Sequence, residues 1–327
     1  MVLFAALAAC LVAVPTTAAA MRATRAGKGV VDRLDARATS VRSYWTPARM
    51  RAAEPAGVLA AEARGASLGT RAEQGAAAAP KRVHERSRLA TLVGHAKRQP
   101  TRTHGKVFFS AGPFDYQCSG TSVKAPSHSL VLTAAHCAYG TGLLGGANQV
   151  HRWEFVPAYN GRRKPFGEWP ATSLAAPVGW ASSGPAFNPI DGEIEGGDSR
   201  YDVGAAIVAR RDGRPLGSVV GATAPGFGRP RGERYLAFGY PASAPCDGRR
   251  EFACGSSYRG ADSTYAHPAP MRIACDMTAG ASGGGWIGRS GRLVSVTSYA
   301  YSDEPSSLYG PFFGPAIRAF YASVKNG

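Results

Sequence analysis

Glycine and proline are the residues that most limit how this chain can fold. The sequence has 327 residues, of which 41 are Gly and 23 are Pro. Both residues interrupt regular elements, because glycine loosens the backbone and proline lacks an N–H donor. Long helices, and with them helical bundles, are therefore disfavoured. Since 44% of the residues are apolar and 18% are charged, the chain can still bury a sizeable core, and we expect short strands joined by turns.

Strand-like segments follow one another from about residue 105 onward. Each is bounded by Gly, Pro or Asn, and many short strands of this kind are typical of a sandwich or barrel. They cover residues 106–110, 130–134, 151–156, 203–208, 235–239, 271–274 and 292–299. One helix is predicted over 315–324, where an apolar stripe has the spacing i, i+3, i+4, i+7. The stripe consists of Ile317, Phe320, Tyr321 and Val324.

The N-terminus has the pattern of an export signal. Residues 2–14 form an unbroken run of 13 apolar residues, and small residues follow at 18–20. This run fits the apolar core of a signal peptide and is too short to span a bilayer. We therefore predict a signal peptide over 1–20 and a secreted protein. The alternative is a lipoprotein signal with a lipid anchor at Cys10. No later stretch reaches ~18 apolar residues, so no membrane span is expected.

Residues 21–104 differ from the remainder in composition. They are rich in Ala and Arg, and residues 1–104 hold 17 basic and 6 acidic side chains, against 21 and 16 in 105–327. We predict a basic, largely disordered propeptide. Four arginines on such a segment offer accessible cutting sites. They are Arg82, Arg88, Arg98 and Arg102. The alternatives are a disordered tail or a polyanion-binding segment. The domain after it is only mildly basic, so no nucleic-acid partner is expected.

The cysteines also indicate an exported protein. There are six, and removal of Cys10 with the signal leaves five, so one is unpaired if the others form disulfides. Exported proteins retain disulfides. No C-x-x-C pair is present, so a structural zinc site is not expected. No calcium loop matches, the histidines are scattered, and neither a metal nor another cofactor is predicted.

Three short segments carry residues suited to nucleophilic catalysis. They contain His136 in LTAAHC, Asp202 in YDVGAAIV and Ser282 in CDMTAGASGGGW. A serine hydroxyl needs an imidazole as general base, and the imidazole needs a carboxylate that holds its tautomer. The oxyanion of an acyl-transfer intermediate needs backbone N–H donors. Gly280 allows a sharp turn before the serine, so the N–H groups of Gly280 and Ser282 could converge on one point. Each segment alone is compatible with a structural role.

Taken together, these segments resemble the chymotrypsin-like serine endopeptidases. The order His, Asp, Ser is that of the family and differs from the orders of subtilisins and α/β-hydrolases. Residues 105–109, 238–241 and 275–286 resemble the bacterial secreted branch that includes glutamyl endopeptidases. The likeness covers about 105–320. It implies an all-β fold of two antiparallel Greek-key β-barrels, about 105–208 and 209–327, with the active site between them.

The same resemblance implies roles for individual residues. His136 would act as general base and then as general acid, Asp202 would orient it, and Ser282 would be the nucleophile. The N–H groups of Gly280 and Ser282 would form the oxyanion hole. Other acidic residues near Asp202 are rivals for its role. They are Asp191, Asp198 and Asp212.

The resemblance also implies two disulfides. Cys118–Cys137 would fix the loop that carries His136, and Cys254–Cys275 would anchor the segment before Ser282. Cys246 is then the odd thiol, although a Cys246–Cys254 pair remains a rival.

The residues that would bind substrate are less clearly marked. Asp276 lies six residues before Ser282, the spacing of an acidic pocket residue that selects Arg or Lys, but it could equally cap a loop. Thr297 stands where the glutamyl branch uses a histidine, so glutamate specificity is not predicted. Ser298, Tyr299 and Ala300 are expected to form the edge that pairs with substrate.

One departure from the family concerns activation. Ala281 replaces an aspartate that pairs with a new N-terminal amine in many animal members, so activation by that ion pair is not expected.

The sequence thus favours a secreted serine endopeptidase that acts as a monomer on proteins or peptides. A catalytically inactive binding module on a protease fold is the alternative.

Overall fold

The computed structural model describes residues 24–26, 29–56, 59–61, 89–94, 100–188 and 194–327. The predicted signal peptide at 1–20 and the alternative lipid anchor at Cys10 lie outside these residues. None of the described helices is long and apolar enough to cross a membrane.

The first half of the domain is a closed antiparallel barrel of six strands. Its strand order is β9-β6-β7-β8-β13-β10, and it closes because β9 also pairs with β10. The strands are β6 (His104–Ala111), β7 (Phe114–Val123), β8 (Leu130–Thr133), β9 (Val150–Pro157), β10 (Trp169–Pro177) and β13 (Gly204–Val208). Large apolar side chains fill the interior, and Trp153, Phe155 and Trp169 are completely buried.

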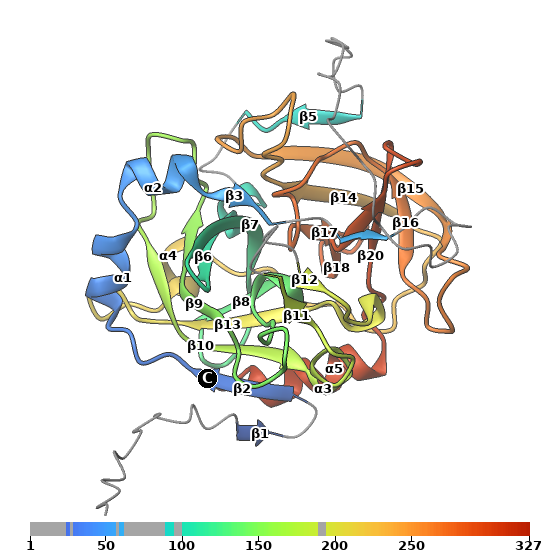
Figure 1. Cartoon of the computed structure of the whole chain (residues 1–327). Helices are drawn as coiled ribbons and strands as arrows, with labels where there is room; N and C mark the ends of the chain where they lie inside the picture. The colour runs from blue at the N-terminus through green and yellow to red at the C-terminus, as the bar shows by residue number, and fades with distance from the viewer. Residues whose placement is uncertain (1–23, 27–28, 57–58, 62–88, 95–99, 189–193) are drawn as a thin grey trace, which may run out of the picture.

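The second half is an open, curved antiparallel sheet (Figure 1, orange and red). Its order is β18-β17-β14-β15-β16-β20-β19. The strands are β14 (Arg234–Gly239), β15 (Phe252–Ala261), β16 (Met271–Ala274), β17 (Gly285–Ile287), β18 (Leu293–Val296), β19 (Tyr299–Tyr301) and β20 (Ser307–Gly310). Trp286 and Ile273 are fully or almost fully buried in its core. The predicted all-β fold of two barrels is therefore confirmed, with the second barrel only partly closed.

A C-terminal helix, α5 (Pro315–Val324), completes the domain as predicted. Ile317, Phe320 and Val324 are buried, and they pack in a cluster with residues of both sheets. The connections carry short elements only. They are η1 (Thr101–Thr103), η2 (Ala135–Cys137), α3 (Val178–Ala181), β11 (Ala186–Phe187), β12 (Ile194–Glu195), η3 (Ser199–Tyr201) and α4 (Leu216–Val220).

The described residues before the first barrel pack against the two halves of the domain. They include seven short elements (Figure 1, blue and cyan). They are β1 (Thr24–Ala26), β2 (Gly29–Arg33), α1 (Ala38–Tyr44), α2 (Pro47–Ala52), β3 (Glu54–Pro55), β4 (Leu59–Ala61) and β5 (Ala90–Leu92). The apolar residues Val41, Trp45 and Met50 are buried, but Val41 lies in α1, Trp45 follows its last residue, and Met50 lies in α2. No single helical stripe results, so periodicity did not reveal them.

Candidate active site

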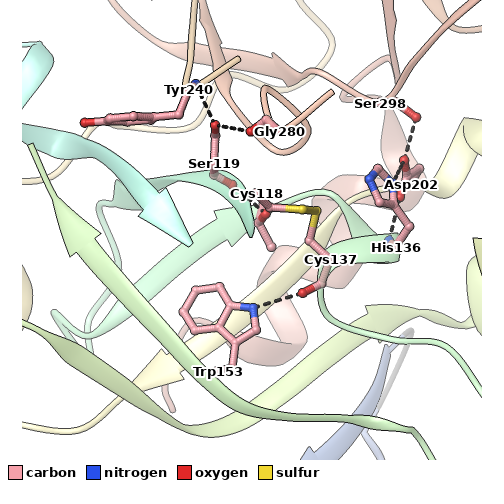
Figure 2. The surroundings of a disulfide bond; sticks show 10 residues. Cys118, Ser119, His136, Cys137, Trp153, Asp202, Tyr240, Gly280 and Ser298 are labelled. Atoms are coloured by element: carbon pink, nitrogen blue, oxygen red, sulfur yellow. Dashed lines mark hydrogen bonds and ion pairs between the residues drawn. A yellow bond between two sulfur atoms is a disulfide. The ribbon is translucent and has the colours of Figure 1, made fainter. Parts of the chain in front are cut away.

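His136 and Asp202 come together because two neighbouring strands present them. β8 ends at Thr133 and leads into η2, which holds His136, while Asp202 directly precedes β13. Since Gly204 of β13 pairs with Thr133 of β8, the two side chains meet at the same end of the barrel. The Nδ1 atom of His136 lies 2.9 Å from Oδ2 of Asp202, and the backbone N–H of His136 donates to Oδ1 at 2.9 Å (Figure 2).

The carboxylate of Asp202 is completely buried and has three hydrogen bonds. The third comes from the Oγ of Ser298, in the second barrel, at 2.5 Å from Oδ2 (Figure 2). Burial alone would raise the pKa of Asp202, but attraction to His136 and the hydrogen bonds from His136 and Ser298 hold its pKa below the ordinary value. Asp202 is thus kept ionised and accepts the Nδ1 proton, which leaves Nε2 of His136 as the free acceptor.

Ser282 lies in the turn before β17, held against the first barrel. Its carbonyl oxygen accepts a hydrogen bond from the N–H of Ser119 at 2.7 Å. A side chain at Gly283 would collide with Thr133, at the end of the strand that leads to His136. Ser282 is completely buried, and neither its Oγ nor Nε2 of His136 has a hydrogen-bond partner among the described residues. Both atoms are therefore free to interact with each other or with a bound substrate.

The turn before Ser282 requires glycine at position 280. Gly280 has a φ of +91°, and an added Cβ would lie 2.8 Å from both the carbonyl oxygen of Tyr240 and the Cβ of Ala242. The hydroxyl of Ser119 donates to the Gly280 carbonyl at 2.8 Å and accepts from the N–H of Tyr240 at 2.9 Å (Figure 2). Within the described chain, no hydrogen bond is formed by the N–H of Gly280 or Ser282. These two donors remain available for an oxyanion.

Both predicted disulfides are present. Cys118–Cys137 joins the residues next to Ser119 and His136, and the indole N–H of Trp153 donates to the carbonyl of Cys137 at 2.9 Å (Figure 2). A ring nitrogen of His136 lies within 4.8 Å of both sulfurs. Because these sulfurs are bonded to each other, the three residues do not offer a metal site.

The second disulfide joins Cys254 on β15 to Cys275, at the start of the segment that leads to Ser282. Cys246 is the free thiol, and the rival Cys246–Cys254 pairing is thereby corrected.

The predicted substrate-binding residues fall into different environments. Asp276 accepts hydrogen bonds from the N–H groups of Leu89 and Ala90, at 3.3 and 2.8 Å, so its carboxylate binds the backbone at the start of β5. Thr297 is completely buried, its Oγ accepts the indole N–H of Trp286 at 3.0 Å, and its backbone bonds to the Gly283–Gly284 turn. These bonds support the loop that carries Ser282.

The predicted edge residues 298–300 lie in and next to β19, whose Tyr299 and Ala300 pair in parallel with Leu59 and Ala60 of β4. Ser298 turns its hydroxyl to Asp202, a role that nothing in the local sequence marks. Tyr299 is completely buried, and its hydroxyl donates to Asp262 at 2.5 Å, while Tyr301 donates to the same carboxylate at 2.7 Å. Asp262, which the sequence did not single out, thus binds two tyrosines of β19 and fixes the position of this strand. Ala300 is half-buried on the same strand.

Comparison with solved structures identifies the family. The protease Anisep from Arthrobacter nicotinovorans is 36% identical, with a TM-score of 0.61 over 71% of this chain and 99% of that protease. The thermostable serine protease AL20 from an extremophilic microorganism is 31% identical, with a TM-score of 0.57 over 69% of this chain and 99% of that one. A Glu endopeptidase in complex with MPD shares the fold at 20% identity, with a TM-score of 0.56 over 73% of this chain and 97% of its own.

Comparison with protein-family models and with curated proteins finds no match. From the solved structures, the chain belongs to the bacterial chymotrypsin-like serine proteases and is a serine endopeptidase. The match covers 99% of the Anisep chain but 71% of this one, so more than a quarter of this chain has no counterpart in the Anisep structure.

Proposed function

We propose that the protein is a secreted serine endopeptidase that uses His136, Asp202 and Ser282 as a catalytic triad. The observation that carries this proposal is the state of the two reactive atoms. Asp202 holds the imidazole through Nδ1, while Nε2 of His136 and Oγ of Ser282 are buried and have no partner among the described residues. A buried polar atom without a partner is unfavourable, and at such a position it points to a function.

The reaction would proceed in two halves. In the first, Nε2 of His136 takes the proton of Ser282 as Oγ bonds to the scissile carbonyl carbon. The oxyanion accepts hydrogen bonds from the N–H groups of Gly280 and Ser282. His136 then gives the proton to the leaving amine nitrogen, the C–N bond breaks, and an acyl-enzyme ester remains. In the second, His136 takes a proton from water, the hydroxide oxygen bonds to the ester carbon, and Ser282 leaves with that proton.

Export and maturation complete the proposal. The two disulfides suit an oxidising compartment, and the apolar N-terminal run suits a signal peptide. The sequence between the signal and the first barrel would be a propeptide, so the protease would be made as a zymogen. Peptide substrates are implied, while the preferred side chain at the cleavage site is left open by the position of Asp276.

A fluorophosphonate probe tests the proposal, because it reacts with an activated serine whatever the substrate preference. We expect one adduct on the intact mass of the secreted protein and none on Ser282→Ala. We also expect Ser282→Ala to lower turnover by about 10⁶-fold with an unchanged circular dichroism spectrum. A trimmed, folded protein without an adduct would instead favour the inactive binding module.

A further inference from the structure

A groove lined by arginines lies between one loop of each half of the domain. It has a volume of about 460 Å³ and is bounded by the connection between β9 and β10 and by the connection between β14 and β15. Its charged residues are Arg162 on the first connection, Asp247, Arg249 and Arg250 on the second, and Arg51 of α2. We call Arg162, Arg249 and Arg250 the arginine cluster, because all three belong to the two halves themselves.

The two connections approach each other closely at this groove. Gly161 has a φ of +75°, and a Cβ added to it would lie 2.9 Å from the Cβ of Arg249. Glycine thus allows the backbone of the first connection to pack on the stem of that arginine. Within the second connection, Nε of Arg249 lies 3.5 Å from Oδ2 of Asp247, and the backbone N–H of Arg249 donates to Oδ1 at 3.0 Å. Arg249 therefore contacts both halves of the domain.

The other two arginines of the cluster have no counter-charge in the described part of the chain. Arg162 and Arg250 are exposed, and neither side chain forms a hydrogen bond or an ion pair with a described residue. Arginines that share one hollow repel one another, and the single carboxylate of Asp247 does not balance them. A hollow lined by charges of one sign also concentrates ions of the opposite sign. The groove is therefore suited to an anion, and a guanidinium binds a carboxylate through two parallel N–H donors.

The connection that carries Arg249 and Arg250 also contacts the turn before the nucleophile. The N–H of Ala242 donates to the carbonyl of Ala279 at 2.7 Å. The N–H of Gly248, which directly precedes the two arginines, donates to the carbonyl of Pro241 at 2.9 Å. This bond closes residues 241–248 into a loop. A short, closed loop thus links the arginine cluster to the nucleophile turn.

The nucleophile turn has two flanks, and they contact different parts of the second half. After Ser282, the N–H of Gly283 donates to the carbonyl of Thr297 at 2.7 Å, next to the edge that is expected to pair with substrate. Before Ser282, a Cβ added to Gly280 would lie 2.8 Å from the Cβ of Ala242, in the loop that leads to the arginines. The expected substrate edge and the arginine loop therefore flank Ser282 on opposite sides of its turn.

We propose that the arginine cluster is an exosite that binds an acidic segment of the protein substrate, on the leaving-group side of the scissile bond. This inference rests on the proposed function and names a substrate class for it. The acyl side of the substrate pairs with the edge at 298–300, and the leaving-group side continues past Ala242 to the arginines. A peptide is favoured over a sulfated polysaccharide because the groove is a single hollow next to the turn that a protein substrate must cross.

The first experiment measures binding in the full-length chain with Ser282→Ala, so that the probe is not cut. A fluorescent hexaglutamate peptide is titrated and followed by anisotropy, with hexaglutamine as the neutral probe. Arg162→Gln combined with Arg250→Gln is the groove variant. Arg259→Gln combined with Arg289→Gln is the matched control, since both arginines are exposed, lie outside the groove and have no described side-chain hydrogen bond or ion pair. Circular dichroism verifies that each variant is folded.

The expected shifts in Kd follow from the charges of the groove. The groove variant should bind hexaglutamate about 10-fold more weakly, because exposed ion pairs are individually weak but two are lost. The control should change Kd by less than about twofold. Asp247→Asn removes the acidic group of the groove and should tighten binding by about threefold. Raising NaCl from about 50 to about 200 mM should weaken binding to wild type, since salt screens exposed charges.

The second experiment measures hydrolysis by the secreted protease. The peptide that wild type cleaves fastest is extended by a run of Glu after the scissile bond, by a run of Gln there, or by a run of Glu before the bond. We expect Glu after the bond to raise kcat/KM about 10-fold over Gln through a lower KM, because exosite contacts are equal in the bound substrate and the transition state. The groove variant should lose this gain, and the control should retain it.

Three results would overturn the inference: equal hexaglutamate binding by the two double variants, equally tight binding of hexaglutamine, or a larger gain from Glu before the scissile bond. Dextran sulfate that binds through Arg162 and Arg250 while hexaglutamate does not would also overturn it and assign the groove to polysaccharides. If no peptide is hydrolysed and Ser282 takes no fluorophosphonate, the proposed function fails instead, and the titration still decides whether the groove binds acidic peptides.

Discussion

Gly280→Ala is the substitution that most directly tests the predicted oxyanion hole. At a φ of +91° an alanine is strained, and its Cβ would lie 2.8 Å from the Tyr240 carbonyl oxygen and from the Cβ of Ala242. Backbone strain of this kind costs about 1–2 kcal/mol. The crowding is with backbone and a short side chain, which cannot move aside, so the turn must shift and carry its N–H away from the oxyanion. Loss of one such donor lowers kcat by about 10²–10³-fold.

Gly291→Ala is the matched control, because it introduces the strain without the crowding. Gly291 has a φ of +69°, and an added Cβ would have no described heavy atom within 4 Å. We expect Gly291→Ala to lose about 1–2 kcal/mol of stability in urea unfolding, Gly280→Ala to lose at least as much because of the added crowding, and only Gly280→Ala to lose turnover. Since the oxyanion forms in the tetrahedral intermediate and the transition states that flank it, and not in the bound substrate, kcat and kcat/KM should fall together. The assay is steady-state hydrolysis, by the trimmed protease, of the casein-derived peptide that wild type cleaves fastest. A folded Gly280→Ala variant with kcat within about fivefold of wild type would refute the assignment.

Two further predictions concern buried charges. Ser298→Ala removes a hydrogen bond to the ionised Asp202 and should cost about 1.5–3 kcal/mol at neutral pH. The pKa of Asp202 lies below its ordinary value, so its contribution to stability is lost as the pH falls through the folded pKa. The variant should therefore unfold at a higher pH than wild type during acid titration, and an unchanged midpoint of the acid transition, followed by circular dichroism, would contradict this. The second prediction concerns Lys106, whose pKa is lowered to about 7 by burial, although Asp247 opposes the shift. Between about pH 7 and 10 the folded protein then binds fewer protons than the unfolded chain, so stability should rise with pH. Lys106→Met should abolish that rise in Tm, and parallel curves for the two proteins would exclude it.

The sequence was informative wherever a residue's role depends on its near neighbours in the chain. Strands β6, β8, β9, β13, β14 and β16 were predicted from their apolar segments and turn residues, and the C-terminal helix from the spacing of Ile317, Phe320 and Val324. The predicted strand over 292–299 is β18 and the first residue of β19, while β7, β10, β15, β17 and β20 were not predicted. His136, Asp202 and Ser282 were recognised because short motifs surround them. The structure brings His136 and Asp202 within hydrogen-bond distance, while their catalytic roles stay predictions until they are tested.

Roles that depend on distant contacts could not be predicted in this way. Ser298 and Ser119 are single polar residues whose hydroxyls act on Asp202 and Gly280, 96 and 161 positions away. No local pattern marks such a contact. Asp262 was missed for the same reason. The strands at 29–33, 54–55 and 59–61 were not predicted, because they pair with β10, β7 and β19 and have no periodicity of their own that marks them.

The two disulfides have a consequence for what an activity measurement reports. Each is local to one half of the domain: Cys118–Cys137 lies in the first and Cys254–Cys275 in the second. No described disulfide joins the halves, so the position of Ser282 relative to the first barrel depends on noncovalent contacts, such as those of Ser119 with Ser282 and of Ser298 with Asp202. Mild denaturant can therefore loosen the contact between the halves while each remains cross-linked internally. Enzyme activity should therefore report how closely the two halves pack against each other. As denaturant is added, we expect activity to fall at a lower concentration than the circular dichroism signal of the domain.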